Sequence, residues 1–255
     1  MKIINRFIPI ILILFLSGCS TADGQVSEVR TFSGIDGVAL LGSGDVSITL
    51  GNKEEITIHA PADLIPYLLT EKKDGTLYIG KRKKGWKKYS SFNDNVHYEL
   101  VIKRLTHISV SGSGDIDAEK LSGDNCSVKV SGSGNIDVEQ INSKELKVQI
   151  SGSGDVDISN VSTDILGVTI NGSGDTDIGG KADELDVTIS GSGNFTGNEL
   201  KSENVSIDIY GSGDARVWAT ESLNAHISGS GDVTYNGNPT VNSRTTGLGN
   251  IKHIK

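Results

Sequence analysis

The sequence has few of the residues from which disulfides, metal sites and catalytic triads are built. Its 255 residues include 2 cysteines, Cys19 and Cys126, and 5 histidines. The histidines have no metal-ligand spacing and form no recognisable Ser/His/Asp arrangement, so neither a zinc site nor a hydrolase triad is expected. Cys126 lacks a disulfide partner in the mature chain, and we expect it to point inward as a small hydrophobic residue. We expect no metal ion, no cofactor and no catalytic residue.

Aromatic residues and prolines are also scarce, at 5% and 4 residues, whereas 32 residues are glycine. A core of valine and isoleucine needs few aromatic rings, and abundant glycine indicates many tight turns. A disordered Gly/Ser-rich linker is the alternative for such a composition. It is excluded because phased apolar residues flank every glycine cluster.

One short phrase recurs along the chain, as in SGSGDID at residues 111–117 and SGSGDVD at 151–157. An earlier copy, LGSGDVS, occupies residues 41–47. The spacing of the copies is nearly constant, as the positions of their first glycines show: 112, 132, 152, 172, 191, 211, 229 and 247. Self-similarity at such a fixed period indicates a solenoid.

Apolar and polar residues alternate on both sides of each glycine turn, which predicts two short β-strands per repeat. A third apolar position, at Leu121 and its equivalents, suggests one more short side. No stretch in the repeats is long enough for a crossover helix, so each strand must pair in parallel with its equivalent one repeat away. The predicted fold is all-β, a single-stranded right-handed parallel β-helix of about eight coils. A right-handed coil is favoured because the sequence lacks the six-residue repeat of left-handed hexapeptide β-helices.

Residues 1–18 have the features of an export signal. Lys2 and Arg6 give it a positive start, and the apolar core Ile8–Leu16 is too short to span a bilayer as a mature helix. The sequence LSGC at residues 16–19 resembles the cleavage site of a bacterial lipoprotein signal peptide.

By that resemblance Cys19 becomes the first mature residue and carries the acyl chains, such as palmitate, that anchor the protein in a membrane. Ser20 stands where many inner-membrane lipoproteins have aspartate, which favours the outer membrane, on its periplasmic side or at the cell surface. A plain secretory signal with an unmodified cysteine is the alternative. Residues 19–30 are polar and unpatterned, and we expect a tether that leads into a β-helix domain at 31–255.

Residues 51–104 interrupt the period before the repeats of 105–252, and we expect this block to cap one end of the solenoid. Residues 61–73 are predicted to form a short helix interrupted at Pro66. Three further segments are predicted strands: 55–60, 76–81 and 97–103.

The capping block is basic, with 11 Lys and Arg against 7 Asp and Glu, although the whole chain has a net charge of −8. Residues 81–92, KRKKGWKKYSSF, combine six basic residues with Trp86 and Tyr89. A solvated hairpin tip is the favoured interpretation, and a patch for anionic glycans or lipid headgroups is the alternative. Nucleic acid is not expected as a partner of an exported acidic protein.

Two rows of acidic residues follow the glycine turns, one through Asp115 and Asp155 and one through Asp117 and Asp157. They suggest calcium, but the calcium-binding nonapeptide repeat of β-rolls has a different period and places its aspartate one position away. Asn135 replaces aspartate in the first row, which favours a side-chain acceptor that closes the glycine turn.

Few aromatic residues are expected to point outward from the repeats. Tyr210 occupies a position that is usually serine, and Trp218 lies in an outward position of the same coil, near Arg216. These three residues are candidates for a platform that stacks on sugar rings. A lateral surface that packs on another protein copy, or on the N-terminal block, is the alternative.

The phased SGSGD phrase, the lipoprotein start and the segment DGTLYIGKRKKGW at 74–86 together resemble the head GIN domain family of auto-transporter adhesins. The resemblance covers roughly residues 31–252. It implies a β-helical fold and a binding role at the cell surface, and it supplies no catalytic motif.

Three functions remain open from the sequence. The first is a lipid-anchored, non-catalytic binding or adhesion module for a glycan or a cell-surface protein. The second is a structural lipoprotein that scaffolds a protein partner in the envelope. The third, a polysaccharide-acting β-helix enzyme, is disfavoured because the short and uniform coils leave no room for a cleft built from loops.

Overall fold

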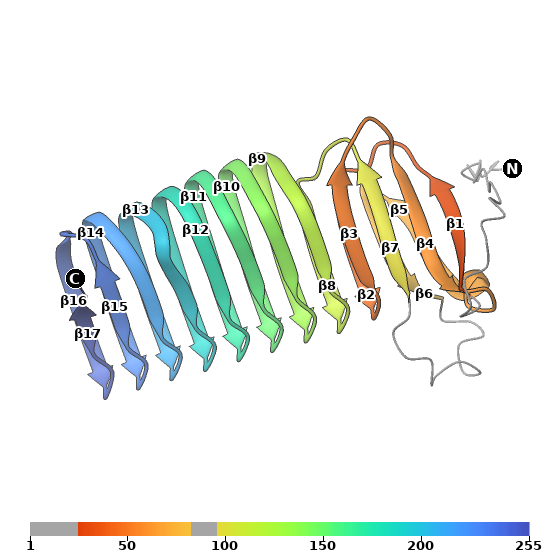
Figure 1. Cartoon of the computed structure of the whole chain (residues 1–255). Helices are drawn as coiled ribbons and strands as arrows, with labels where there is room; N and C mark the ends of the chain where they lie inside the picture. Colours follow the sequence, from red (N-terminus) through yellow and green to blue (C-terminus); the bar gives the residue numbers. More distant parts are fainter. Residues whose placement is uncertain (1–24, 83–95, 255) are drawn as a thin grey trace, which may run out of the picture.

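The computed structural model describes residues 25–82 and 96–254, and it is a β-solenoid rod of about seven turns (Figure 1). No helix in this part of the chain is long and apolar enough to cross a bilayer. The elements are β1 (Gln25–Thr31), β2 (Gly37–Gly42), β3 (Asp45–Leu50), β4 (Glu55–Pro61), the 3-10 turn η1 (Ile65–Tyr67), β5 (Leu68–Lys73), β6 (Thr76–Lys81), β7 (His97–Ile102), β8 (His107–Gly112), β9 (Ile116–Gly132), β10 (Ile136–Gly152), β11 (Val156–Gly172), β12 (Thr176–Gly191), β13 (Phe195–Gly211), β14 (Ala215–Gly229), β15 (Val233–Asn236), β16 (Thr240–Gly247) and β17 (Ile251–His253).

Each regular coil is a single strand that bends once and is followed by a short glycine corner. β10 pairs in parallel with β9 and β11, and equivalent residues face each other, as in Ile136 with Val156 and Gly152 with Gly172. The predicted parallel solenoid is therefore confirmed. The two predicted strands and the third side are instead two limbs of one continuous strand, since β10 runs from Ile136 to Gly152 and pairs with β11 on both sides of its bend (Figure 1). We call the part after a corner the first limb and the part before the next corner the second limb.

Aliphatic columns inside the coils form the core, as the alternation predicts. In the coil of β10, for example, Ile136, Val138 and Ile141 on the first limb and Val148 and Ile150 on the second limb are at most 2% exposed. Adjacent coils are only about 4.8 Å apart, so β-branched side chains of neighbouring coils stack directly on one another.

Cys126 points into this core, as predicted, in the column of Leu146. Burial raises the pKa of its thiol to about 11, an effect that the nearby Arg104 partly offsets. The thiol is therefore protonated at neutral pH and behaves as a small apolar group.

The corners require glycine at two positions. The first, such as Gly152, has a positive φ of 138°, which few other residues adopt. The second has no such dihedral, but a Cβ on Gly154 would lie 2.0 Å from the carbonyl oxygen of Gly134 in the preceding coil. The corner carbonyls are also doubly used, since the oxygen of Gly132 accepts from the amides of Ser153 at 2.8 Å and Gly154 at 3.2 Å.

The N-terminal block closes one end of the rod, as expected of a cap. β6 and β7 pair in parallel with β2 and β3, on the side opposite β8 and β9, and so form an extra end coil. Beyond them the direction reverses, because β5 pairs antiparallel with β6 and β4 antiparallel with β7. The open parallel edge that a solenoid would otherwise expose is thus covered.

Two predictions for this block are wrong. The helix expected over 61–73 is only the turn η1 followed by strand β5, because β5 and β6 form a hairpin. Its turn residues Asp74 and Gly75 have φ of 49° and 82°, which is typical of a type I′ hairpin turn.

The tether expected over 19–30 does not include residues 25–30, because residues 25–31 form β1, antiparallel to β4. Arg30 of β1 is buried and reaches across the end of the solenoid. Its Nε donates to Glu28 at 2.6 Å, and its Nη1 donates to the hydroxyl of Thr70 in β5 at 2.6 Å. This segment is thus part of the cap rather than of a linker.

Within residues 25–82 and 96–254, the other end of the rod has no comparable cover. β16 pairs with β14 and β17 with β15, and every residue of β16 is exposed. Its inward positions hold Ser243 and Thr245, in register with Ala225 and Ile227. Polar residues at these positions keep a terminal coil soluble, as the sequence predicts.

A matched pair of glycine substitutions tests the packing of the corners. Gly154→Ala is expected to destabilise the fold by about 2–3 kcal/mol because the new methyl overlaps a neighbouring backbone. Gly167→Ala, at a position where a Cβ meets nothing within 4 Å, is the control. Thermal denaturation followed by circular dichroism should show a fall in Tm of about 5–10 °C for Gly154→Ala. Equal melting of the two variants would contradict the corner geometry.

Candidate functional site

The first acidic row, through Asp115 and Asp155, holds neighbouring coils together. Each side-chain Oδ1 accepts a hydrogen bond from the backbone amide of the equivalent residue in the next coil, at 2.7 to 3.0 Å. The bonds run in sequence through Asp115, Asn135, Asp155, Asp175, Asn194, Asp214, Asp232 and Asn250. The predicted acceptor role is correct, but the partner is the adjacent coil rather than the residue's own turn. Asparagine serves as well as aspartate because only one oxygen is needed.

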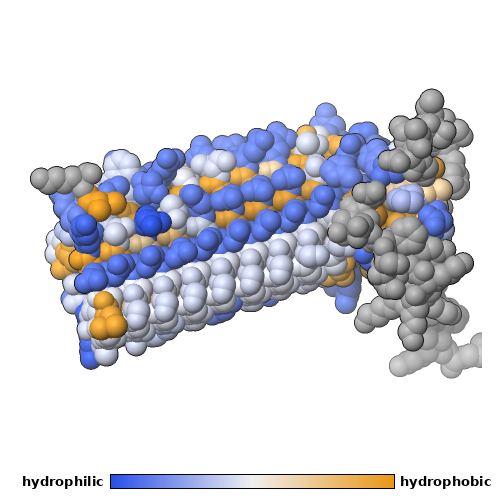
Figure 2. Space-filling model, turned by 60° about the horizontal axis from the view of Figure 1, so that its bottom comes forward, coloured by the Kyte–Doolittle hydropathy of each residue, from blue (hydrophilic) through white to orange (hydrophobic). Residues whose placement is uncertain are grey.

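No group of His, Cys, Asp or Glu side chains in residues 25–82 and 96–254 is arranged to hold a metal ion. Figure 2 shows the rod from the side of the corners. A pale band runs along the molecule, with hydrophilic bands beside it.

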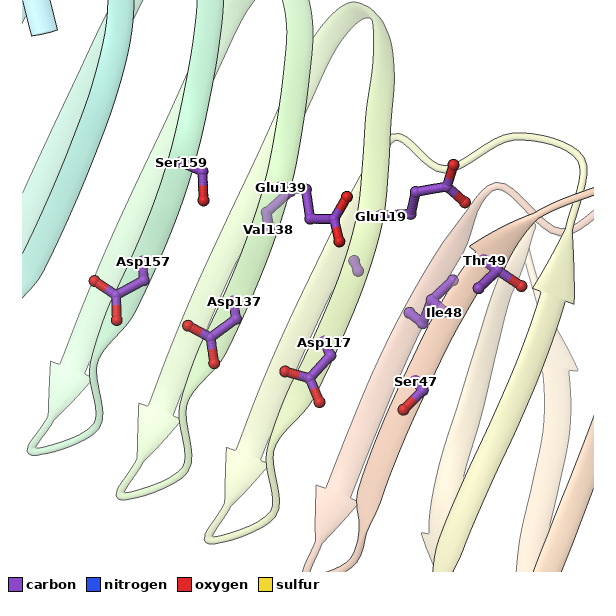
Figure 3. Close-up of a pocket in the computed structure, with 11 residues that line it drawn as sticks. Ser47, Ile48, Thr49, Asp117, Glu119, Asp137, Val138, Glu139, Asp157 and Ser159 are labelled. Atoms are coloured by element: carbon purple, nitrogen blue, oxygen red, sulfur yellow. The ribbon is translucent and has the colours of Figure 1, made fainter.

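The second acidic row lines an open hollow of about 540 Å³ on the first limb. In Figure 3, Asp117, Asp137 and Asp157 point outward from successive coils, with Glu119 and Glu139 further along the limb. Glu119 also caps the end of β3, since its Oε2 accepts from the amide of Leu50 at 3.1 Å.

Stacked carboxylates alter their own titration. Partial desolvation, followed by repulsion from Asp157 and Asp117, raises the pKa of Asp137 above its ordinary value. Partial desolvation, with repulsion from Asp157 and Glu199, likewise raises the pKa of Asp177. The row therefore gives this part of the rod a concentrated negative charge that opposes folding at neutral pH.

The sign of the charge reverses further along the same row. The register pairs Asp177 with Thr196, Thr196 with Arg216, Arg216 with Thr234 and Thr234 with Lys252. The acidic positions of the early coils thus become basic in the last ones. We did not predict this reversal from the sequence, although an alignment of the repeats on their glycines shows it.

The predicted aromatic platform is not a single surface. Arg216 and Trp218 lie on the first limb of β14, and Trp218 is 37% exposed. Tyr210 lies on the second limb of β13, next to the corner. Its ring is edge-on to the ring of His226, with 6.2 Å between the two ring centroids. The structure thus brings Arg216 and Trp218 together and places Tyr210 on the other limb.

Trp218 borders an open hollow of about 460 Å³ near the C-terminal end, formed with the following residues: Asn236, Gly237, Asn238, His253 and Ile254. Cys19, Trp86 and Tyr89 lie outside the described residues. Of the basic segment 81–92, only Lys81 and Arg82 are described, where the chain leaves β6 at the corner edge.

Replacing one residue of the first row tests its hydrogen bonds. Asp155→Ala removes the acceptor for the Asp175 amide and is expected to cost about 1 kcal/mol, a fall in Tm of about 3 °C. Asp155→Asn keeps the acceptor and should melt within about 1 °C of the wild type. Thermal melts should be unchanged by calcium. The interpretation fails if both variants lose equal stability.

The second row makes a prediction about pH. Because the native pKa of Asp137 is raised, the folded state binds its proton more readily, and wild-type stability is lost as pH rises through the native pKa. Asp137→Asn should therefore raise the Tm at pH 7 by about 1–2 °C, allowing for solvent screening, and the gain should shrink as pH falls towards the ordinary aspartate range. Asp186→Asn, whose neighbours in the adjacent coils are Gly167 and Ser206, is the control. A lower Tm for Asp137→Asn at pH 7 would contradict the repulsion.

Comparison with known proteins places this geometry in a family. No curated protein matches the chain. Among solved structures, a "putative lipid binding protein" from Parabacteroides distasonis ATCC 8503 is 25% identical, with a TM-score of 0.83 over 92% of this chain and 98% of that one. A "putative adhesin" from Parabacteroides merdae ATCC 43184 is 22% identical, with a TM-score of 0.85 over the same shares. A "putative adhesin" from P. distasonis is 24% identical, with a TM-score of 0.84 over 91% and 98%.

These structures share the solenoid. The family model described as "Putative auto-transporter adhesin, head GIN domain" matches residues 34–239, which is most of the chain. The resemblance found in the glycine phrase is therefore confirmed, and the chain belongs to the head GIN domain family that this model describes.

Proposed function

We propose that the chain is a non-catalytic binding module, an adhesin, held at the outer membrane by lipid on Cys19. The descriptions of its relatives support a binding role, since its family is described as "Putative auto-transporter adhesin" and one solved neighbour as a "Putative lipid binding protein". The observation that carries the proposal is the regular rod, whose outward side chains repeat in register from coil to coil. Such a surface suits an extended partner that contacts several coils at once.

The direction of the rod supports the proposed anchor. The described chain starts at Gln25, in the cap, whereas β16 and β17 form the opposite end (Figure 1). At about 4.8 Å per coil, seven coils separate the two ends by roughly 35 Å. A lipid on Cys19 would hold the capped end near the membrane and present the last coils away from it.

A structural lipoprotein with a protein partner is the second candidate. The observation that favours it is the edge of β16, which pairs with β14 on one side and with no strand of the described chain on the other. Its other edge offers backbone donors and acceptors to an extended segment of a second protein.

Replacing the proposed lipidation site tests the anchor. Cys19→Ala is expected to abolish incorporation of labelled palmitate and to move the protein from the membrane to the soluble fraction, because the acyl group requires the thiol. Cys126→Val, which removes the other cysteine at a buried position, should keep both the label and the membrane fraction. Labelling that persists in Cys19→Ala would contradict the anchor.

The binding role is tested on the detergent-purified full chain with a glycan array and with intact cells. Saturable binding without shortening of any bound polysaccharide is the expected result. Release of new reducing ends would contradict the non-catalytic role. Protease treatment of intact cells separates display at the surface, where the rod is cleaved, from the periplasmic side, where it is protected.

A further inference from the structure

The hollow beside Trp218 arises where the coils become shorter. The last two complete coils, with first glycines at 211, 229 and 247, are shorter than the earlier ones, and between β15 and β16 the chain crosses the bend at positions 237–239. Gly237 has a φ of 92°, and a Cβ there would lie 2.0 Å from the carbonyl oxygen of Ala219 and 3.2 Å from Cδ1 of Trp218. The backbone thus packs closely against one edge of the indole, while the ring remains partly exposed to the hollow.

The polar groups around the Trp218 ring are available for hydrogen bonds to a ligand. The indole N–H of Trp218 and the side-chain amides of Asn236 and Asn238 form no hydrogen bond within residues 25–82 and 96–254. By contrast, the Asp and Asn side chains of the first row bind the next coil throughout the repeats. An exposed aromatic ring with free amide donors and acceptors at its edge suits a sugar, whose C–H face stacks on the ring and whose hydroxyls bind the amides.

The charge beside this hollow is positive. Arg216 and Lys252 occupy the same outward row two coils apart, which is about 10 Å at the usual strand spacing. Neither forms an ion pair with any described residue. Asp214 and Asp232 precede Arg216 and Thr234 by two residues and accept the amides of the next coil, whereas residues 233–254 contain no Asp or Glu. Between the two cations, the hydroxyl of Thr234 is covered and has no hydrogen-bond partner in the described chain.

We infer that this surface, made by Trp218, Arg216, Lys252, Asn236 and Asn238, binds an anionic saccharide. One ring stacks on Trp218, and carboxylate or sulfate groups of the same chain pair with Arg216 and Lys252. The inference rests on the proposed binding function and gives it a ligand class. The acidic row through Asp137 and Asp177 repels a polyanion, so the saccharide is confined to the last coils, at the end opposite the cap.

Isothermal titration of the full chain, purified in a non-ionic detergent, tests this inference. The probes are oligogalacturonate and a heparin oligosaccharide, and methyl-esterified oligogalacturonate is the neutral match. We expect Trp218→Ala to weaken binding of the anionic probe about tenfold, which is the loss of one stacking contact. The double variant Arg216→Gln, Lys252→Gln should remove the preference for the free acid over the ester and the sensitivity to salt.

The control variants remove an aromatic ring and a cation at positions outside the proposed site. Tyr210→Ala deletes an aromatic ring that is 50% exposed on the second limb, and Arg244→Gln deletes an exposed cation of β16. Both should bind within about twofold of the wild type, a difference below about 0.5 kcal/mol. Because Arg216 and Lys252 are exposed, their variants should keep the wild-type Tm. Trp218 is 37% exposed and packs against the backbone at Gly237, so Trp218→Ala should lower the Tm by about 2–4 °C, and its binding is measured well below that Tm.

Three results would overturn the inference: no binding of either anionic probe, equal binding of the acid and the ester, or wild-type affinity in Trp218→Ala. Binding to phosphatidylglycerol nanodiscs without binding to the saccharides would also overturn it, in favour of a lipid headgroup. Adhesion to intact cells is measured in parallel on the same variants. If cell binding persists while saccharide binding is absent, the adhesin function stands and the assigned ligand fails.

Discussion

The close approach of stacked glycine corners governs the rest of this molecule. The carbonyl of one corner accepts two amides of the next, and there is no space for a side chain at the second glycine of the pair, such as Gly154. This contact holds successive coils at one strand spacing and one register. The aliphatic columns inside and the Asp/Asn hydrogen bonds outside can then repeat without adjustment.

The same constraint shapes the surface. A residue facing outward in one coil must lie about 5 Å from its equivalents in the next coils, so any charge that is repeated becomes a row of like charges. The chain tolerates such repulsion at Asp137 and Asp177 because these carboxylates remain exposed to solvent. Where the row changes to Arg216 and Lys252, the repulsion ends. The charge along this row therefore changes sign where the repeated residue changes.

The regular part of the fold can be predicted because its signal is local and repeated. Residues such as Val148 and Ile150 recur at fixed distances from each glycine, so their burial and parallel pairing follow from the sequence alone. β1 gives no such signal, because it pairs with β4, beyond β2 and β3 in the chain, and only Glu28 and Arg30 of its residues are buried. The apolar content of residues 61–73 favours a helix, whereas the Asp74–Gly75 turn has the stronger influence on the fold.

The candidate site is only partly predictable for the same reason. The repeat pattern identifies Trp218 and Arg216 as outward residues, but their separation from Tyr210 depends on the corner between the two limbs. The hollow itself depends on a shortened bend and on Gly237, features that belong to two coils together. Neither can be read from a single repeat.

The regular stacking of the middle coils has a consequence for how such proteins vary in length. β9, β10 and β11 are equal in length and pair without a register shift, so a whole coil could be duplicated or deleted among them while the corner contacts are retained. Each such event changes the distance between the two ends by one strand spacing of about 4.8 Å. The length of such a rod can therefore change only in steps of one coil.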